Sequence, residues 1–228
     1  MVSHQDEIEL KFELEKRDAP KLLKYCRKAF KSGQTQALES VYFDTQEQHL
    51  RRAGFTLRVR HLGKRRIQTL KASEEATAGL FVRPEWERDI KGDAPLLDRE
   101  TDLLHQFVPK RTLANLQPVF RTIIRRELFE AVVRDSRFEV SLDQGEVRAG
   151  RRKRTICEVE LELKRGEPSH LFKLAKDIGA TVPLRLGVQS KAERGYDLTR
   201  SVEARAVKAD PVPLAPEMTS AKALQAIT

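Results

Sequence analysis

Charged and apolar residues alternate from residue 7 to residue 14, a stretch that reads Glu-Ile-Glu-Leu-Lys-Phe-Glu-Leu. Successive side chains of an extended strand point to opposite faces, so the alternation predicts one charged face and one apolar face. The carboxylates of Glu7 and Glu9 then share a face with the ammonium of Lys11, and such a face could hold a hard cation beside an anionic ligand. Taken alone, the segment fits equally well an exposed edge strand whose charges discourage aggregation.

The same alternation returns along the chain, and this recurrence favours the first interpretation. It is found in residues 55–60, 67–71, 83–89 and 158–164, and the last of these repeats the opening strand almost residue for residue. If the apolar faces pack outward against helices, the charged faces must look at one another across an enclosed space. Because unpaired buried charge is costly, such an interior is stable only when it is wet and holds a charged ligand.

Periodicity and turn signals divide the chain into about eight strands and several helices. The strands are expected near residues 5–15, 36–44, 55–60, 67–71, 83–89, 116–133, 136–149 and 152–164, the seventh with a turn near 143–145. The helices are expected over residues 18–30, 46–52, 95–107, 168–178 and 190–198. Short connections between strands imply antiparallel pairing, and a barrel leaves no open edge. The predicted fold is mainly β (α+β), a closed eight-stranded antiparallel barrel tunnel with helices packed outside.

Composition narrows the class of ligand. Charged residues make up 34% of the 228 residues and the net charge is +9, which indicates an anionic partner. The interleaved carboxylates would repel a nucleic-acid backbone, and aromatic residues are only 6%, so no nucleic acid is expected. Cys26 and Cys157 fit no metal or redox spacing and are interpreted as buried thiols in a reducing compartment. With no membrane-length apolar run and no signal peptide, we expect a cytoplasmic protein without membrane contact.

The end of the chain differs from the rest. Residues 210–216 read Asp-Pro-Val-Pro-Leu-Ala-Pro, which is typical of a stiff linker, and residues 219–228 have the pattern of a beginning helix. We therefore expect a tunnel domain over residues 1–200, followed in residues 201–228 by a linker and the start of a truncated C-terminal helical domain.

Eight short motifs occur in an order that resembles the CYTH superfamily, the triphosphate tunnel metalloenzymes, over residues 5 to about 200. They are Glu7-x-Glu9-x-Lys11, Tyr42-Phe43-Asp44-Thr45, Leu57-Arg58-x-Arg60, Thr69-Leu70-Lys71, Arg83-x-Glu85-x-Glu87, Asp143-x-Gly145, Glu158-x-Glu160-x-Glu162 and Ser190-Lys191. The chain looks most like bacterial inorganic triphosphatases in which a CYTH domain precedes a helical, polyphosphate-associated CHAD domain. The proline-rich linker and the helix after it resemble the start of that second domain.

The resemblance implies hydrolysis of inorganic triphosphate, or of short polyphosphate, to pyrophosphate and phosphate with Mg²⁺ or Mn²⁺. The catalytic residues it implies are Glu7, Glu9, Lys11, Lys71 and Glu160. The substrate-binding residues are Lys11, Arg58, Arg60, Lys71, Arg83, Arg126 and Lys191. The metal ligands are Glu7, Glu9, Glu158 and Glu160, and Glu85, Glu87, Asp143 and Glu162 are further possible site residues. Arginine forks and lysine ammonium groups match phosphate oxygens, and hard cations prefer carboxylate oxygens.

Several of these positions leave alternatives open. Only one of Arg125 and Arg126 can face the tunnel, and the family pattern favours Arg126. Glu162 serves a second metal ion or lies at the tunnel mouth. Lys191 contacts the ligand from a closing helix or is a solvated helix residue. The carboxylates of Glu85 and Glu87 either bind metal or position Arg and Lys side chains or a water molecule.

Three other functions would use the same charged lining. A class IV-type adenylate cyclase and a thiamine triphosphatase would share the tunnel, although no nucleobase pocket is evident in the sequence. A polyphosphate-binding module without catalysis would keep the basic residues but could lose the carboxylates, and here Glu7, Glu9, Glu158 and Glu160 are all present.

Overall fold

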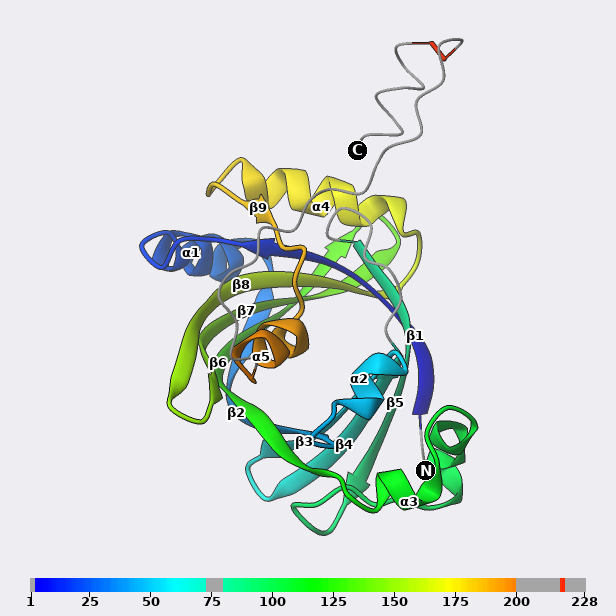
Figure 1. The fold of residues 1–228 in the computed structure, drawn as a ribbon. Coiled ribbons are helices and arrows are strands. Elements are labelled where there is room, and N and C mark those ends of the chain that lie inside the picture. The colour runs from blue at the N-terminus through cyan, green and yellow to red at the C-terminus, as the bar shows by residue number, and fades with distance from the viewer. Residues whose placement is uncertain (1–2, 73–79, 200–217, 220–228) are drawn as a thin grey trace.

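A computed structural model describes residues 3–72, 80–199 and 218–219 of the chain. Its strands form one sheet in the order β5-β4-β3-β2-β6-β7-β8-β1-β9, and a further pairing of β5 with β1 closes the first eight into a barrel (Figure 1). The strands are β1 (Ser3–Glu13), β2 (Lys31–Asp44), β3 (Phe55–Leu62), β4 (Arg65–Ala72), β5 (Leu80–Ile90), β6 (Gln117–Val133), β7 (Ser136–Ala149), β8 (Arg152–Arg165) and β9 (Arg185–Leu186). Neighbouring strands pair antiparallel throughout, which confirms the predicted fold class.

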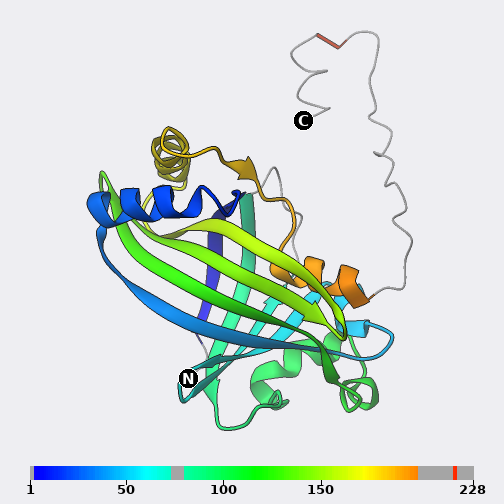
Figure 2. The ribbon, with the colours of Figure 1, turned by 90° about the vertical axis from the view of Figure 1, so that its left-hand side faces the viewer.

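The alternation in β1 separates the two faces of the barrel wall as predicted. Leu10 and Phe12 point outward and belong to an apolar cluster, whereas Glu7, Glu9 and Lys11 line the interior. The outer cluster packs β1 and the strands β6 to β8 against the helices α1 (Ala19–Ala29) and α4 (Ser169–Gly179), which lie over the same side of the barrel (Figure 2). Both faces of β1 are therefore buried, one against helices and one against the charged interior.

A second outer cluster covers β3 and β4. Leu57 and Leu70 pack there with Leu50 of α2 (His49–Arg52), Leu104 of the 3₁₀ helix η1 (Arg99–Gln106) and Leu113 of α3 (Lys110–Leu113). The predicted helix over 95–107 is thus wrong in extent and type, because it is a 3₁₀ helix that begins at Arg99.

The last helix, α5 (Lys191–Thr199), departs from the expectation that all helices pack outside. It lies within the ring of strands in Figure 1 and at one end of the barrel in Figure 2. Its residues Ala192 and Tyr196 pack with Phe120 and other apolar residues that face the interior at that end. A Cβ atom on Gly195 would overlap the Phe120 ring, so a glycine permits this close approach. The charged lining therefore occupies only part of the interior.

Three details of the strands also differ from expectation. β2 begins at Lys31, earlier than predicted, with a register shift between Lys31 and Gln34. The predicted turn near 143–145 does not exist, because β7 continues through it and the chain reverses at Gly150, which has a φ of 56°. Gly145 instead lets the β6 backbone approach, since a Cβ atom there would overlap the carbonyl of Ile123.

The predicted linker and helical start in residues 201–228 lie outside the described residues, apart from 218 and 219. Within the described ranges, no helix combines the length and apolar character needed to cross a membrane.

Candidate active site in the barrel

A cavity of about 760 Å³ lies inside the barrel, lined by side chains from the strands β1 to β8 and from the helices α2 and α5. The predicted site residues on its wall are Glu7, Glu9, Lys11, Arg58, Arg60, Lys71, Arg83, Glu85, Glu87, Arg126, Glu160, Glu162 and Lys191. The two other candidates, Asp143 and Glu158, are fully buried and both contact Lys191. The structure thus brings every predicted site residue to one region.

The carboxylates of β1 are held by basic side chains of β4 and β5. Both oxygens of Glu7 accept hydrogen bonds from Lys71 Nζ, at 2.7 and 2.6 Å, and Arg83 donates to Glu7 and Glu9 at 2.9 and 3.1 Å. Burial would raise the pKa of Glu7, but Lys71 and Arg83 outweigh it and hold this pKa well below its usual range. The pKa of Glu9 is instead raised by burial and by the Glu160 carboxylate.

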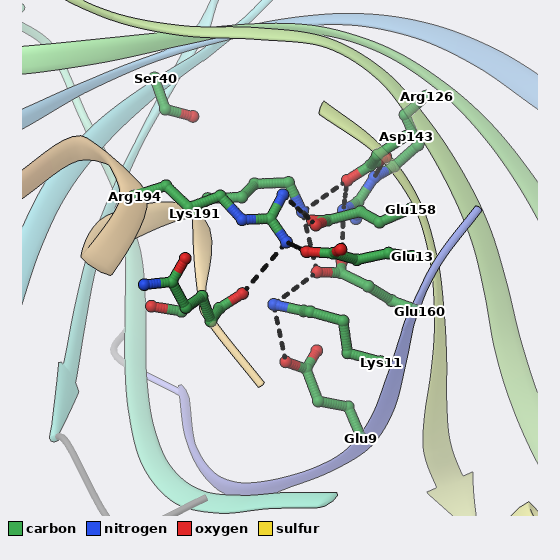
Figure 3. Close-up of polar contacts among 12 residues, drawn as sticks. Glu9, Lys11, Glu13, Ser40, Arg126, Asp143, Glu158, Glu160, Lys191 and Arg194 are labelled. Carbon is green, nitrogen blue, oxygen red and sulfur yellow. Dashed lines mark hydrogen bonds and ion pairs between the residues drawn. The ribbon is translucent and has the colours of Figure 1, made fainter. Parts of the chain in front are cut away.

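The carboxylates of β7 and β8 form a tighter acidic cluster. One oxygen from each of Asp143, Glu158 and Glu160 lies within 4.8 Å of the others (Figure 3). We call these three residues the carboxylate triad. Because β7 and β8 pair Asp143 with Glu158 and Ser141 with Glu160, the alternation of both strands places the triad on one inward face.

Four basic side chains contact the triad, as Figure 3 shows. Lys191 Nζ lies 2.8, 2.5 and 2.8 Å from oxygens of Asp143, Glu158 and Glu160. Arg126 donates to both oxygens of Asp143 at 2.7 Å and to Glu160 at 2.9 Å. Arg194 lies 2.9 Å from Glu158, and Lys11 lies 3.1 Å from Glu160. Burial alone would lower the pKa of Lys191, but the triad raises it above its usual range.

The arginines of β3 have weaker partners. The Arg58 guanidinium lies 3.8 Å from Glu85 and 3.7 Å from Glu87, beyond hydrogen-bond distance. Arg60 donates to Ser40 at 3.4 Å, and among the described residues no carboxylate lies within ion-pair distance of it. Burial and the nearby charges of Arg58 and Arg126 lower the pKa of Arg60 to about 10. This part of the wall therefore carries positive charge that is only partly compensated.

The structure settles two of the open alternatives. Arg126 faces the cavity, while the Arg125 side chain is 58% exposed and pairs with Glu127. Lys191 is no solvated helix residue, because its side chain is only 11% exposed and points at the triad. Glu162 lies on the cavity wall and accepts a hydrogen bond from Lys164 at 2.7 Å.

The candidates on β5 lie between basic and hydroxyl groups. Glu85 is 3.3 Å from Lys71, and Glu87 accepts a hydrogen bond from Thr69 at 2.7 Å. These contacts suit carboxylates that position the Arg58 and Lys71 side chains, which is one of the roles expected from the sequence.

Sequence reasoning missed Arg194 and Glu13. Arg194 is 3% exposed and joins Glu13 to Glu158 through ion pairs of 2.7 and 2.9 Å. A signal for it existed, since Arg194 follows Lys191 by three residues and side chains at this spacing share a helix face. Glu13 continues the charged alternation of β1.

The carboxylate triad has the donor set of a site for a hard divalent cation. All three donors are carboxylates, which suit Mg²⁺ and Mn²⁺. Both oxygens of Glu158 are buried and, in the part of the chain that is described, make ion pairs but no hydrogen bond of good geometry. Glu7 and Glu9, also predicted as ligands, lie on the neighbouring strand β1 and contact basic side chains in this structure.

Known proteins resemble this chain in sequence and fold. A model of the CYTH domain matches residues 5–196. An inorganic triphosphatase from Haemophilus influenzae is 31% identical over 196 residues, an alignment that covers 83% of this chain and 54% of that protein. The chain therefore spans about half the length of this curated relative.

Solved structures share the barrel. A putative adenylate cyclase from Bacillus halodurans aligns with a TM-score of 0.58 at 18% identity, over 84% of this chain and 97% of that one. A putative adenylyl cyclase from Hippeastrum, described as having a dominant triphosphatase activity, aligns with a TM-score of 0.58 at 20% identity, over 84% of this chain and 95% of that one. These likenesses concern the fold alone. The match to the family model, over most of the chain, shows that it belongs to the CYTH domain family.

Proposed function

We propose that this domain hydrolyses inorganic triphosphate to pyrophosphate and phosphate with a divalent metal ion, Mg²⁺ or Mn²⁺. The observation that carries the proposal is one cavity lined both by under-compensated arginines and by Glu160 and Lys191, which join it to the buried carboxylates Asp143 and Glu158 of the triad. The first feature suits a highly charged anion, and the second suits the cation that would accompany it. The relative from Haemophilus influenzae, an inorganic triphosphatase, supports the same substrate class.

Substrate binding would rest on the basic residues of the wall. Arg60 has no carboxylate partner among the described residues, so a phosphate oxygen would add an ion pair without breaking one. Arg58 would give up its two long contacts to Glu85 and Glu87. Its planar guanidinium would then bind a phosphate group through two N–H donors. Lys71 and Arg83 are already held in place by Glu7, which limits the conformational freedom lost when they bind substrate.

The residues that would hold the metal ion are Asp143, Glu158 and Glu160, and Glu7 and Glu9 stay predicted ligands from β1. When bound, a divalent ion neutralises charge on phosphate oxygens and helps to orient an attacking water molecule. Arg126 bridges Asp143 and Glu160 with three hydrogen bonds and so fixes their spacing.

A nucleotide substrate is the main alternative, since two structural neighbours carry the name of putative cyclases. Recognition of a base would need a free aromatic face or a similar platform. Of the aromatic residues on the described cavity wall, Tyr42 stacks on Phe120, and Tyr196 packs between Phe120 and Arg51. Lys11 and Arg83 lie over the ring of Phe81. These engaged faces favour an inorganic substrate.

A binding module without catalysis is the second alternative. It would need the basic residues only, whereas burying three carboxylates within 4.8 Å of one another has a high desolvation cost. Retention of the carboxylate triad therefore favours a metal-dependent reaction.

Initial rates on three substrates would test the proposal. Purified protein is incubated with tripolyphosphate, ATP or thiamine triphosphate and with Mg²⁺, Mn²⁺ or a chelator, and released phosphate is measured. We expect metal-dependent release with the highest kcat/KM for tripolyphosphate. Preference for either organic triphosphate would replace the substrate assignment. Absence of metal-dependent release from all three would overturn hydrolysis, and retained binding of tripolyphosphate would then identify a binding module.

A further inference from the structure

One cationic side chain contacts all three members of the carboxylate triad. Lys191 Nζ lies between 2.5 and 2.8 Å from an oxygen of each of Asp143, Glu158 and Glu160. An ammonium group carries three donors, which matches three carboxylates in number. The Lys191 ammonium therefore lies at the point where oxygens of all three carboxylates converge.

The position between the three carboxylates is already taken by cationic groups. The triad contacts four basic side chains, namely Lys191, Arg126, Arg194 and Lys11, of which Arg194 also pairs with Glu13 and Lys11 with Glu9. Two further positive charges in a buried site would be repelled by the four already present, since such interactions are strong away from water. A metal ion can bind the triad only if one of the basic groups leaves.

Lys191 is the group that can leave at least cost. Lys11 and Arg126 belong to the barrel wall, and Arg126 is tied to Asp143 by two hydrogen bonds. Lys191 has a flexible four-carbon stem and already lines the cavity in which an anion would bind. Its ammonium can exchange the triad for phosphate oxygens by rotation of the side chain.

The backbone of Lys191 is fixed independently of the triad. Ser190 N donates to Glu193 at 2.6 Å, and Glu193 N donates to Ser190 Oγ at 3.1 Å, which is the reciprocal pattern of a capping box. Tyr196 further anchors α5 by donating to Asp44 at 2.8 Å. The helix can therefore stay in place while the Lys191 side chain moves.

We infer that the Lys191 ammonium and a divalent metal ion are mutually exclusive occupants of the carboxylate triad, so that Lys191 acts as a positioning residue that couples metal binding to triphosphate binding. The inference rests on the proposed metal site. Without an anion in the cavity, Lys191 competes with the metal ion and weakens its binding. With triphosphate present, Lys191 finds phosphate oxygens as new partners and the metal ion binds more tightly. Coupling of this kind is reciprocal, so metal must also tighten triphosphate binding.

Mn²⁺ affinity of the protein without substrate tests the inference. Mn²⁺ is titrated into wild-type protein and into Lys191→Met, with free Mn²⁺ followed by electron paramagnetic resonance at one pH. We expect Lys191→Met to bind Mn²⁺ about tenfold more tightly, within the usual range of coupling between two sites. A non-hydrolysable triphosphate analogue should then raise the Mn²⁺ affinity of the wild type more than that of the variant.

Three further variants make the result specific. Lys164→Met removes another cavity lysine that contacts Glu162 and not the triad, and it should leave Mn²⁺ affinity unchanged. Lys191→Arg keeps the charge, and it should not reproduce the gain seen with Met. If Lys191→Met fails to fold, Lys191→Gln, which also removes the charge, takes its place with the same expected gain. Asp143→Asn removes a donor and should weaken Mn²⁺ binding.

The outcomes distinguish a failure of the proposed metal site from a failure of the exchange by Lys191. If Asp143→Asn has no effect on Mn²⁺ affinity, the metal site itself is misplaced and the proposed function is at fault. If Asp143→Asn weakens binding while Lys191→Met binds Mn²⁺ no better than wild type, the metal site stands and the exchange by Lys191 is overturned. An equal gain in Lys191→Met and Lys191→Arg would also overturn it, because charge would then not be the cause.

Discussion

The adjacent strands β1 and β8 carry nearly the same alternating sequence, but different side chains surround their carboxylates. β1 presents Glu7 and Glu9, and β8 presents Glu158 and Glu160, with Lys11 and Glu160 directly opposite each other. On β1 the carboxylates pair with Lys71 and Arg83, whereas on β8 they join Asp143 in an acidic cluster around Lys191, which Arg126, Arg194 and Lys11 also contact.

β1 and β8 pair with each other, and the difference comes from the other strand with which each of them pairs. β1 also pairs with β5, whose register places Arg83 opposite Glu7. β8 also pairs with β7, whose register places Asp143 opposite Glu158. Alternation thus decides which side chains face the cavity, while the adjacent strand decides whether a carboxylate is paired with a base or with another acid. On this basis the β8 side is the stronger candidate for metal binding, and the β1 side for holding the bases that we propose bind substrate.

The largest effect is expected for Glu160→Gln, which keeps the shape and removes the charge of a triad member. Metal catalysis contributes several kcal/mol, and about 1.4 kcal/mol is tenfold in rate, so kcat on tripolyphosphate should fall by about a hundredfold or more. Mn²⁺ affinity should fall in parallel. Glu146→Gln, on the outer side of β7 where Glu146 pairs with Arg148, is the matched control and should retain activity.

Glu9→Gln sharpens the comparison with Glu160→Gln. The sequence predicts both residues as metal ligands, but Glu9 contacts Arg83 and Lys11 in the structure. We expect Glu9→Gln to reduce Mn²⁺ affinity less than Glu160→Gln does, measured by the same titration. Equal losses of Mn²⁺ affinity in the two variants would contradict this comparison and would indicate a metal site shared by β1 and β8.

A smaller effect is expected for Arg60→Gln. It removes one contact to the substrate, and a hydrogen bond to a charged group is worth roughly 1.5–3 kcal/mol, so KM for tripolyphosphate should rise by about tenfold or more. Removing one of several crowded cations should also raise the melting temperature of the protein without substrate. Arg125→Gln, the exposed arginine on β6, is the control for loss of charge. An unchanged KM in Arg60→Gln would remove Arg60 from the binding site.

Tyr196→Phe should cost about 1 kcal/mol of unfolding free energy, because it removes the hydrogen bond to Asp44 and leaves a buried acceptor with one partner fewer. Denaturant unfolding would measure it, with Tyr25→Phe on the outer helix α1 as the control. If α5 is the element that presents Lys191, this variant should also lower the coupling between metal and triphosphate. Unchanged stability would mean that this hydrogen bond does not help to hold α5 in place.

The smallest effect is expected on the outer face of β8. Cys157 precedes Glu158 and its side chain lies with the outer apolar cluster, so the thiol should react slowly in the native protein. Because the proposed metal site lies on the inner face, Mn²⁺ should not change the rate of thiol labelling at this residue. Faster labelling with Mn²⁺ would show that β8 shifts as a whole.

Sequence reasoning recovered the barrel because the alternation of β1, β3, β5 and β8 is strong and local. It missed β9, a two-residue strand that joins β1 at Phe12 and Glu13, beyond the part of β1 that β5 covers. It also placed a long helix over 95–107, where only the 3₁₀ helix Arg99–Gln106 forms. These elements depend on contacts that periodicity does not encode.

The structure places the predicted site residues together in the barrel interior, but their arrangement there could not be predicted. Arg126, which the family pattern favoured over Arg125, faces the cavity; Lys191, for which the sequence left two alternatives open, is buried there; and Asp143 was a candidate. The grouping of Asp143 with Glu158 could not be predicted, because it depends on the register between β7 and β8. Arg194 was missed since an arginine on a short helix is ordinarily exposed, and only the position of α5 inside the barrel buries it.

The difference between the two strands is tested most directly by anomalous diffraction from crystals grown with Mn²⁺ and a non-hydrolysable triphosphate analogue. We expect an anomalous peak for a Mn²⁺ ion bound by Asp143, Glu158 and Glu160, with the Lys191 side chain turned to the phosphate groups. A peak bound by Glu7 and Glu9 alone, with Lys191 still among the three carboxylates, would contradict it.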